Sequence, residues 1–500
     1  MIKNEVGKGA IYVYIQLISS MVSGYIFFII LARITTTEII GIFSLLLALS
    51  EIFGNIAILG LPDGMQRFLG KSFFQNKLSD ARVFVKLSLV FLSIGIVSSL
   101  VLILSLRDWL YSAFGIDSNL VIVVSLLISS YAIYTVLYYI IIATLKTKKL
   151  PIIITISSTA KLIMAITLVS LGGGVIGLAL GYTFFGQILS AILLGIVIIK
   201  MFKPSVNLAK SELKYGNASK ELLKAGVASW IPILITTLGI DLGTLVLYGS
   251  HGPYQSGIYF LTLAILNALT AVTYAIFTIS LPALSSMEDG RKRFTWDIIR
   301  LSSILLLPLT ISIFFYPDEI MRFFGNVYVQ GSSSLQILLL STLPIIVSSG
   351  IDALVFANGR YGHAISINLA INVPRTILYF SLVPIFGMTG AAIAFTIGSV
   401  IGLIVSLIVA KSITMKIYWK YLALILLTPV VIALVFSTLN VNYIIGIPST
   451  IIISYLVLMK LKIILKTDIL FLIGLLPGKI SKKLLLLLGR LDKITDWFYS

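Results

Sequence analysis

Five charged side chains lie inside long apolar stretches of the sequence, where charges are rare. They are Glu51, Lys161, Asp241, Asp352 and Arg375. Each costs on the order of 3 kcal/mol if it faces lipid at the centre of a membrane, so each is expected to face protein or a wet cavity. The two cations are suited to binding an anion, and the three acids to binding a proton or another cation.

These charges have two interpretations. In the first, Glu51 pairs with Lys161 and Asp241 pairs with Arg375, so that the charges are structural and bind no ligand. In the second, Lys161 and Arg375 bind the phosphate or pyrophosphate of an anionic substrate, which suits a guanidinium with its bidentate donors. The two are compatible, because an acid can hold a cation until a substrate displaces it. Glu51, Asp241 and Asp352 are then candidates for ion coupling.

The surroundings of Arg375 are polar. Pro374 precedes it directly and removes a backbone hydrogen bond, which tends to kink a helix. Asn368 and Asn372 lie seven and three residues before Arg375, and therefore on roughly the same helix face. This polar stripe suits either packing between helices or contact with a sugar in a cavity.

The chain that carries these charges is almost entirely a membrane domain. Hydrophobic residues make up 58% of the 500 residues and charged residues 11%, which excludes an ordinary soluble globular protein. Apolar stretches long enough to cross a hydrocarbon layer of roughly 30 Å recur along the whole sequence. They predict an all-α polytopic protein with fourteen spans, at residues 9–32, 39–61, 87–106, 119–144, 150–171, 175–199, 225–248, 254–284, 301–316, 334–357, 363–385, 389–410, 421–438 and 442–459.

The basic residues predict the orientation. With both termini in the cytoplasm, 32 of the 37 lysines and arginines fall in inside segments, and Arg33, Arg107 and Arg322 fall outside. This distribution follows the positive-inside rule and predicts a multi-pass protein of the cell membrane. The net charge of +18 is accordingly interpreted as a topology signal with contacts to anionic membrane lipids, and not as a nucleic-acid interface.

Glycines indicate an internal repeat. Gly41 in EIIGIF and Gly257 in YQSGIY each open a span and lie 216 residues apart. Gly174 in GGVIGLAL and Gly387 in GMTGAAIA each join two spans and lie 213 residues apart. Because this offset covers six spans, an even number, the two halves are expected to be parallel repeats.

The repeat also relates the two intramembrane cations and sets the domains. An offset of 214 residues superposes Lys161 on Arg375, so each half places a cation at the middle of its fifth helix. The predicted domains are an N-terminal six-helix lobe at 1–199, a cytoplasmic linker at 200–224, a C-terminal six-helix lobe at 225–410, an extra transmembrane pair at 421–459 and a basic, leucine-rich tail at 460–500 that is expected to lie on the inner leaflet.

Several kinds of chemistry are excluded by what the sequence lacks. It has no cysteine, and its histidines are His251 and His363, so thiolate and histidine-rich metal sites are excluded. The segment GLLPGKIS at 474–481 is one residue too short for the phosphate-binding loop of nucleotide hydrolases and follows no strand. The predicted outside loops are too short for a catalytic domain. We therefore expect no enzymatic activity, no metal and no cofactor.

The segment at 24–70 resembles the opening of the polysaccharide biosynthesis flippases. Its elements are a Leu-Ala-Arg sequence ending at Arg33, then Gly41, then a Gly-Leu pair at 60–61 before Arg67. The segment GMTGAAIA at 387–394 resembles the join between the eleventh and twelfth spans of that family. The family belongs to the multidrug/oligosaccharidyl-lipid/polysaccharide exporter superfamily.

This resemblance implies a fold of two six-helix lobes around a central cavity. It also implies a function, the flipping of a lipid-linked (pyro)phosphate oligosaccharide from the inner to the outer leaflet by alternating access, for the assembly of a surface glycan. Other glycan-assembly proteins are then candidate partners. The alternative is a cation-coupled exporter of small molecules with the same fold, in which the acids rather than the cations are central.

Overall fold

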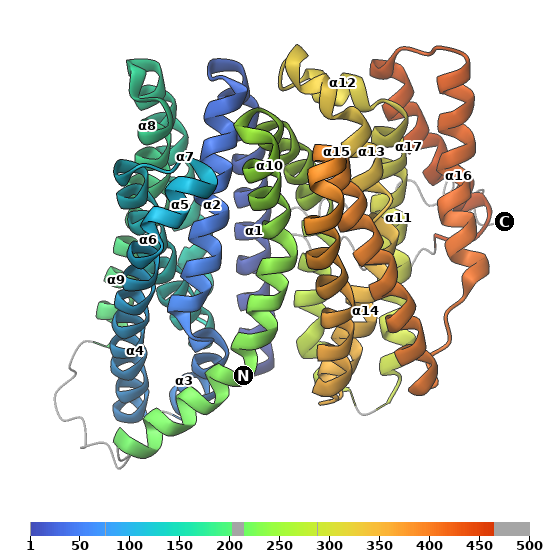
Figure 1. The fold of residues 1–500 in the computed structure, drawn as a ribbon. Coiled ribbons are helices and arrows are strands. Elements are labelled where there is room, and N and C mark those ends of the chain that lie inside the picture. The colour runs from blue at the N-terminus through green and yellow to red at the C-terminus, as the bar shows by residue number, and fades with distance from the viewer. Residues whose placement is uncertain (1, 76, 203–214, 288, 465–500) are drawn as a thin grey trace. The chain divides into compact units, whose positions relative to one another are not determined.

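The structure is a computed structural model that describes residues 2–75, 77–202, 215–287 and 289–464. Residues 203–214 of the predicted linker and 465–500 of the predicted tail lie outside these residues. The described part of the chain is helical and contains no β-strand. Its elements (Figure 1) are α1 (Ile2–Ile34), α2 (Thr37–Ile58), α3 (Leu61–Phe74), α4 (Leu78–Ser105), α5 (Arg107–Phe114), α6 (Ser118–Ala143), η1 (Thr147–Lys149), α7 (Leu150–Leu168), η2 (Val169–Gly173), α8 (Gly174–Leu180), η3 (Gly181–Ile188), α9 (Leu189–Met201), α10 (Tyr215–Ser286), α11 (Arg291–Phe315), α12 (Pro317–Arg322), η4 (Asn326–Gly331), α13 (Ser332–Leu339), α14 (Thr342–Ala357), α15 (Tyr361–Ser412), α16 (Trp419–Thr438) and α17 (Tyr443–Lys460).

Ten helical segments of the described chain are long and apolar enough to cross a membrane, or eleven if the bent pair Asn326–Leu339 and Thr342–Ala357 counts as one span. Three of them contain more than 50 residues, where about 20 suffice for one crossing. Each of the three is broken by glycine with non-helical dihedrals, at Gly172, Gly252 and Gly387. These breaks lie in the gaps between predicted spans. The polytopic helical class is confirmed, and the count of fourteen stays a prediction.

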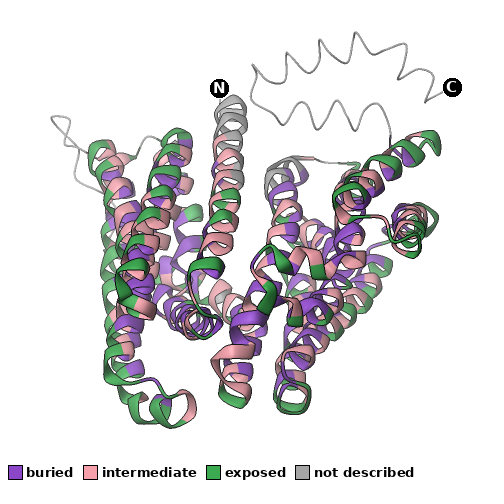
Figure 2. Ribbon diagram, turned by 90° about the horizontal axis from the view of Figure 1, so that it is seen from above, coloured by how far each residue is buried: buried purple, intermediate pink, exposed green. Residues whose placement is uncertain are grey.

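Apolar residues also cover the outside of the helices. On α4, Val90, Ile94, Val97 and Val101 recur every three or four residues and are between 54% and 62% exposed. Figure 2 shows exposed residues, in green, along the helices and not only at their ends. An apolar stripe at helical spacing that no protein covers is typical of a lipid-facing helix, which supports a multi-pass membrane protein.

The backbone repeats at two of the predicted glycines. Gly174 has φ 49° and ψ −135°, and Gly387 has φ 56° and ψ −134°. This conformation is open to glycine and strained for other residues. Three residues later, Gly177 and Gly390 each lie against a backbone carbonyl of the preceding helical arm, that of residue 168 and that of residue 382. The shared conformation supports the internal repeat.

The other repeated pair of glycines forms a direct contact. A Cβ at Gly41 would overlap the carbonyl of Pro253, and a Cβ at Gly257 would overlap the carbonyl of Thr37 and lie 3.0 Å from the Gly41 nitrogen. Close by, the hydroxyls of Ser44 and Ser256 are 3.2 Å apart. The start of α2 therefore lies backbone to backbone on α10 just after the break at Gly252, a close approach that small residues allow.

The chain divides into two compact units. Unit 1 comprises residues 1–261 and 372–395, and unit 2 comprises residues 262–371 and 396–500. The core of unit 1 is formed by α2, α3, α4, α6, the start of α7, α9 and the start of α10. The core of unit 2 is formed by the end of α10 with α11, α14, α15 and the start of α16. Both α10 and α15 therefore contribute to both units.

The last two helices belong to unit 2 and pack on α11. Ile304, Leu307, Ile425 and Leu458 form a small buried cluster between the three helices. Two hydrogen bonds add to this packing: the Tyr316 hydroxyl donates to the Val441 carbonyl at 3.1 Å, and the Tyr455 hydroxyl to the Leu305 carbonyl at 3.2 Å.

We predict that Gly387→Ala destabilises the protein by about 1–3 kcal/mol, because alanine is strained at φ 56° and its Cβ would overlap the Gln255 side chain. The melting temperature of the purified full-length protein in detergent measures this effect. Gly362→Ala is the matched control in the same helix, since no heavy atom lies within 4 Å of a Cβ there. Equal melting temperatures for the two variants would contradict the proposed role of Gly387.

Candidate functional site

Lys161 lies half-buried on α7 between two aromatic rings. Its Nζ is 4.9 Å from the centroid of Phe27 and 4.8 Å from that of Tyr182. Gly186 leaves room for its alkyl chain, because a Cβ there would lie 3.0 Å from the lysine Cδ. Within the described ranges no carboxylate lies within 4.0 Å of this ammonium group. Cation–π contacts therefore take the place of the ion pair with Glu51 that the sequence suggested.

Glu51 is the one accessible residue in the middle of α2, between the buried stretches 43–50 and 52–54. Glu51 lies within electrostatic range of Tyr182 of η3, Tyr131 of α6 and Asp241 of α10. Of these, Tyr182 also contacts the Lys161 ammonium through its ring.

Asp241 lies inside unit 1 near Glu51. Its Oδ2 atom is buried and has no hydrogen-bond partner among the described residues. One turn away, the Asn55 side-chain amide donates to the Thr237 hydroxyl at 3.0 Å, and the Trp230 indole donates to the Asn55 carbonyl at 2.9 Å. These bonds hold α2 against α10, so that the two carboxylates of Glu51 and Asp241 are brought together by the packing.

Arg375 is only 4% exposed and is held inside unit 1. Its Nε donates to the Phe395 carbonyl at 3.1 Å, its Nη1 donates to Asn372 Oδ1 at 3.4 Å, and its guanidinium carbon is 3.7 Å from the centroid of the Phe395 ring. Residues 375 and 395 lie on opposite sides of the break at Gly387. Arg375 therefore joins the two arms of the α15 hairpin, and this geometry favours a structural role for it.

The other polar residue of the stripe takes part in a separate contact in unit 2. Asn368 Nδ2 donates to Asp352 Oδ1 at 3.4 Å and to the Ala364 carbonyl at 3.0 Å. Asn372 instead lies against Gly239, where a Cβ would overlap its side chain. The two asparagines thus belong to different units, and α15 connects them.

Aromatic residues that sequence reasoning did not single out surround the charges. Beside Phe27 and Tyr182, the Tyr379 hydroxyl donates to the Gly239 carbonyl at 3.1 Å, two residues from Asp241. Tyr379 also lies within electrostatic range of Arg375 and Asp241. The sequence holds 23 tyrosines and 27 phenylalanines, and no spacing distinguishes these few from the rest.

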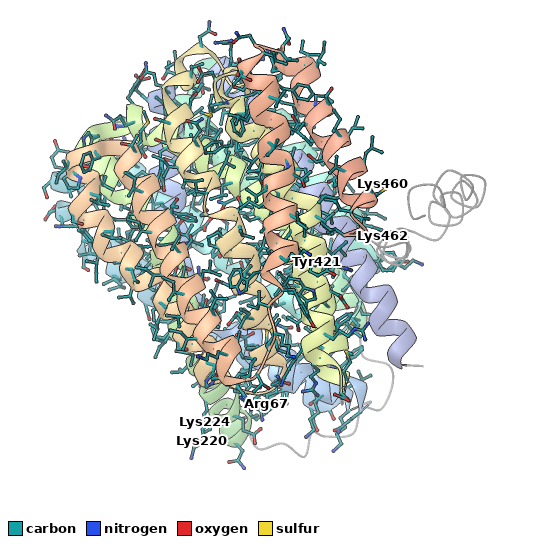
Figure 3. The ribbon with its side chains drawn as sticks, turned by 90° about the vertical axis from the view of Figure 1, so that its right-hand side faces the viewer. Arg67, Lys220, Lys224, Tyr421, Lys460 and Lys462 are labelled. Atoms are coloured by element: carbon teal, nitrogen blue, oxygen red, sulfur yellow. The ribbon has the colours of Figure 1, made fainter. Side chains whose placement is uncertain are left out.

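The residues of the family motif lie at helix ends or in packing contacts. Arg33 is exposed in the last turn of α1, and Gly41 is the contact glycine described above. Arg67 is exposed on α3, with its guanidinium 5.2 Å from the centroid of Phe68 (Figure 3 labels Arg67). In the part of the chain that the structure describes, no group of three or more His, Cys, Asp or Glu side chains is arranged to hold a metal ion.

We predict that Arg375→Lys lowers the stability by about 1–3 kcal/mol, because lysine keeps the charge but loses the planar stacking on Phe395 and the paired donors. The melting temperature of the purified protein measures this, with the exposed Arg360→Lys as control. A variant that melts like the wild type and yet fails to transport would instead assign Arg375 to substrate binding.

Comparison with known proteins gives matches in structure alone. No family model and no curated protein matches the sequence. The structure is similar to that of the lipid II flippase MurJ in an inward closed conformation, with a TM-score of 0.60 and 16% identity over 85% of this chain and 96% of that one. It is also similar to an inward-facing multidrug resistance MATE family transporter of the MOP superfamily, with a TM-score of 0.58 and 15% identity over 81% and 94% of the two chains.

A variant of the MATE transporter VcmN from Vibrio cholerae gives a TM-score of 0.57 and 14% identity, over 83% of this chain and 97% of that one. At these identities the similarity shows the fold. It agrees with the resemblance found in the sequence, and the chain is a helical membrane protein with the fold of the multidrug/oligosaccharidyl-lipid/polysaccharide exporter superfamily.

Proposed function

We propose that this protein is a transporter that flips a lipid-linked (pyro)phosphate oligosaccharide from the inner to the outer leaflet by alternating access. The observation that carries the proposal is Lys161, an ammonium group inside the membrane domain that contacts two aromatic rings and, among the described residues, has no carboxylate within 4.0 Å. The fold supports it, because the solved structures with this fold include one named a lipid II flippase.

An aromatic ring interacts with a lysine in a different way than a carboxylate does. A carboxylate would cancel the positive charge, whereas a ring attracts the ammonium through its quadrupole and carries no net charge itself. The rings around Lys161 therefore leave the charge of the protonated ammonium available to an anion. An anion such as a phosphate diester is the partner that suits this charge, and a charge-assisted hydrogen bond to it is among the strong ones.

The sequence suggested the same two roles, phosphate binding and structural pairing, for both Lys161 and Arg375. We assign different roles to the two residues. Lys161 is half-buried, with a flexible side chain that can follow a substrate between two states, while Arg375 is buried and fixed by hydrogen bonds. We therefore carry Lys161 into the proposed phosphate site. Substrate binding by Arg375 stays a prediction, which the Arg375→Lys variant tests.

Glu51 and Asp241 are the proposed coupling acids. Two carboxylates close together inside a membrane domain repel each other unless a proton or a metal cation joins them. A cation bound there favours whichever conformation holds the acids together, and this difference in affinity drives the change between states. Asp352 has an asparagine partner of its own and is not part of this pair.

The second candidate function is the cation-coupled export of small molecules, and the Glu51 and Asp241 pair is the observation that favours it. Several of the solved structures with this fold are named MATE transporters, among them a multidrug resistance transporter. In that case the acids bind the coupling ion, and Lys161 needs no anionic substrate. The proposed orientation, with both termini in the cytoplasm of a cell-membrane protein, is the same for both functions and rests on the basic residues.

We predict that Lys161→Gln slows the flipping of a fluorescent lipid-linked pyrophosphate oligosaccharide in proteoliposomes by roughly tenfold or more, the effect of one lost charge-assisted contact. Lys161→Arg is expected to retain most of the rate, since it keeps the cation. Lys149→Gln, an exposed lysine at the start of the same helix, is the matched control. Normal flipping by Lys161→Gln at equal reconstituted amounts would overturn the phosphate site.

We also predict that Glu51→Gln and Asp241→Asn each remove the acceleration that an imposed proton or sodium gradient gives to transport. The reason is that an amide keeps the shape of the carboxylate but binds no cation. The same proteoliposomes measure this with and without a gradient, and Asp117→Asn at the exposed N-terminus of α6 is the control. A gradient effect that survives in both variants would contradict the role of the pair.

The two candidate functions are distinguished by which substrate the protein transports. The flippase predicts transport of the lipid-linked pyrophosphate and none of cationic dyes, and Lys161→Gln then impairs it. Transport of dyes that depends on Glu51 and Asp241, and not on Lys161, would favour the exporter.

A further inference from the structure

A cavity of about 480 Å³ lies in unit 2, between the start of α11 and the segment that leads into α16. We call it the α11–α16 pocket. Its walls come from the first turns of α11, from the non-helical stretch between α15 and α16, and from the first turn of α16. It is lined by Lys292, Arg293, Trp296, Asp297, Arg300, Thr414, Lys416, Tyr418 and Tyr421.

The pocket is strongly basic. Four of its lining residues are cations and one is an acid. The Lys292 ammonium donates to the Thr414 hydroxyl at 2.7 Å, which holds it at the wall. Arg300 is only 7% exposed, and its Nη2 lies 3.8 Å from Asp297 Oδ1. Since one carboxylate balances at most one of the four cations, the pocket keeps a net positive charge suited to an anion carrying more than one negative charge or several acceptor oxygens.

Aromatic rings form the rest of the lining. Trp296 is 6% exposed at the floor, and its ring centroid is 5.2 Å from that of Tyr418, which is 6.3 Å from that of Tyr421. Tyr418 and Tyr421 are exposed at the rim. Tryptophan and tyrosine beside arginine and lysine are typical of the level of the lipid headgroups, where one end of the ring is apolar and the other is wet.

The position of the pocket in the fold also corresponds to that level. Lys292 and Arg293 begin α11, whose apolar part runs on from residue 301, and Trp419 begins the apolar helix α16. Figure 3 labels Tyr421 on α16 and, where α17 ends, the further basic residues Lys460 and Lys462. The distribution of basic residues predicts that all of these helix ends are on the cytoplasmic side, where anionic lipids attract such clusters.

We propose that the α11–α16 pocket binds the phosphate of an anionic phospholipid headgroup from the membrane that surrounds the protein. Arg300 and Lys416 would contact the phosphate oxygens, and Lys292 and Arg293 would close over the headgroup from the rim. The chemistry recognised is a phosphate ester in a headgroup of net negative charge, and its source is the membrane lipid rather than a soluble phosphate. This site lies in unit 2, whereas Lys161 lies in unit 1, so the inference is independent of the proposed transport function.

The test is a lipid titration of the purified full-length protein in detergent, with binding followed by native mass spectrometry. The lipids are phosphatidylglycerol and, as the neutral comparison, phosphatidylcholine. The pocket variant is Lys292→Gln with Arg293→Gln and Lys416→Gln, all exposed positions whose loss leaves the core intact. We expect wild type to prefer phosphatidylglycerol, and the pocket variant to bind it about tenfold more weakly or worse.

A matched triple variant controls for net charge. Lys77→Gln with Lys220→Gln and Lys224→Gln removes three exposed lysines that are also predicted to be cytoplasmic and lie outside the pocket (Figure 3 labels Lys220 and Lys224). It is expected to bind phosphatidylglycerol as the wild type does. If both triple variants lose the same affinity, or if neither does, the pocket is not the site and the proposal is wrong.

A further experiment repeats the lipid titration with inorganic pyrophosphate added as a soluble competitor. It tests whether the phosphate bound in the pocket comes from a lipid or from a soluble molecule. Phosphatidylglycerol binding that survives millimolar pyrophosphate supports the membrane lipid. Displacement of the lipid by pyrophosphate in the wild type, together with pocket-dependent pyrophosphate binding, would overturn the lipid as the source. Lys416→Glu, a single exposed change, is the second variant and is expected to repel the lipid without altering the melting temperature.

Discussion

A chain inside a membrane has no water to bond its backbone, and this constraint decides where the helices can end. Every amide and carbonyl at membrane depth needs a partner within the protein, so a helix turns back only where another group supplies one. At Gly387 the Gln255 side chain fills this role, because its Oε1 accepts from the Met388 amide at 3.2 Å. Arg375 donates to the Phe395 carbonyl from the other arm of the hairpin and so ties the two arms together. The helix break and the buried polar side chains near it therefore belong together, because the side chains bond backbone groups of the hairpin.

The two cations show how equivalent positions of a repeat acquire different surroundings. Both lie on the helix that precedes a glycine break, and both contact aromatic rings. The arginine also donates to a backbone carbonyl and to an amide, as its fixed fork of donors allows. The lysine has a single ammonium on a flexible stem and stays half-buried. The chemical difference between the two side chains therefore suits Arg375 to a fixed structural contact and Lys161 to a position in which its charge can move.

The sequence was enough for the fold class and for the positions of the breaks. Hydrophobic runs identify helices directly, because the membrane allows little else, and glycines mark the places where the dihedrals leave the helical region. It also located the charged residues, since a charge in an apolar run stands out. What it did not give is the partner of each charge. Lys161 contacts Phe27 and Tyr182, which are far from it in the chain and are chemically like dozens of other aromatic residues.

The matching backbone of Gly174 and Gly387 has a consequence for the history of the chain. If the two halves arose by duplication, their side chains could diverge wherever the packing adjusted, as the lysine of one half and the arginine of the other illustrate. A dihedral pair that other residues adopt only with strain allows no such divergence, so a substitution there is costly in either half. Glycines in such a conformation are therefore expected to stay recognisable after the residues around them have changed.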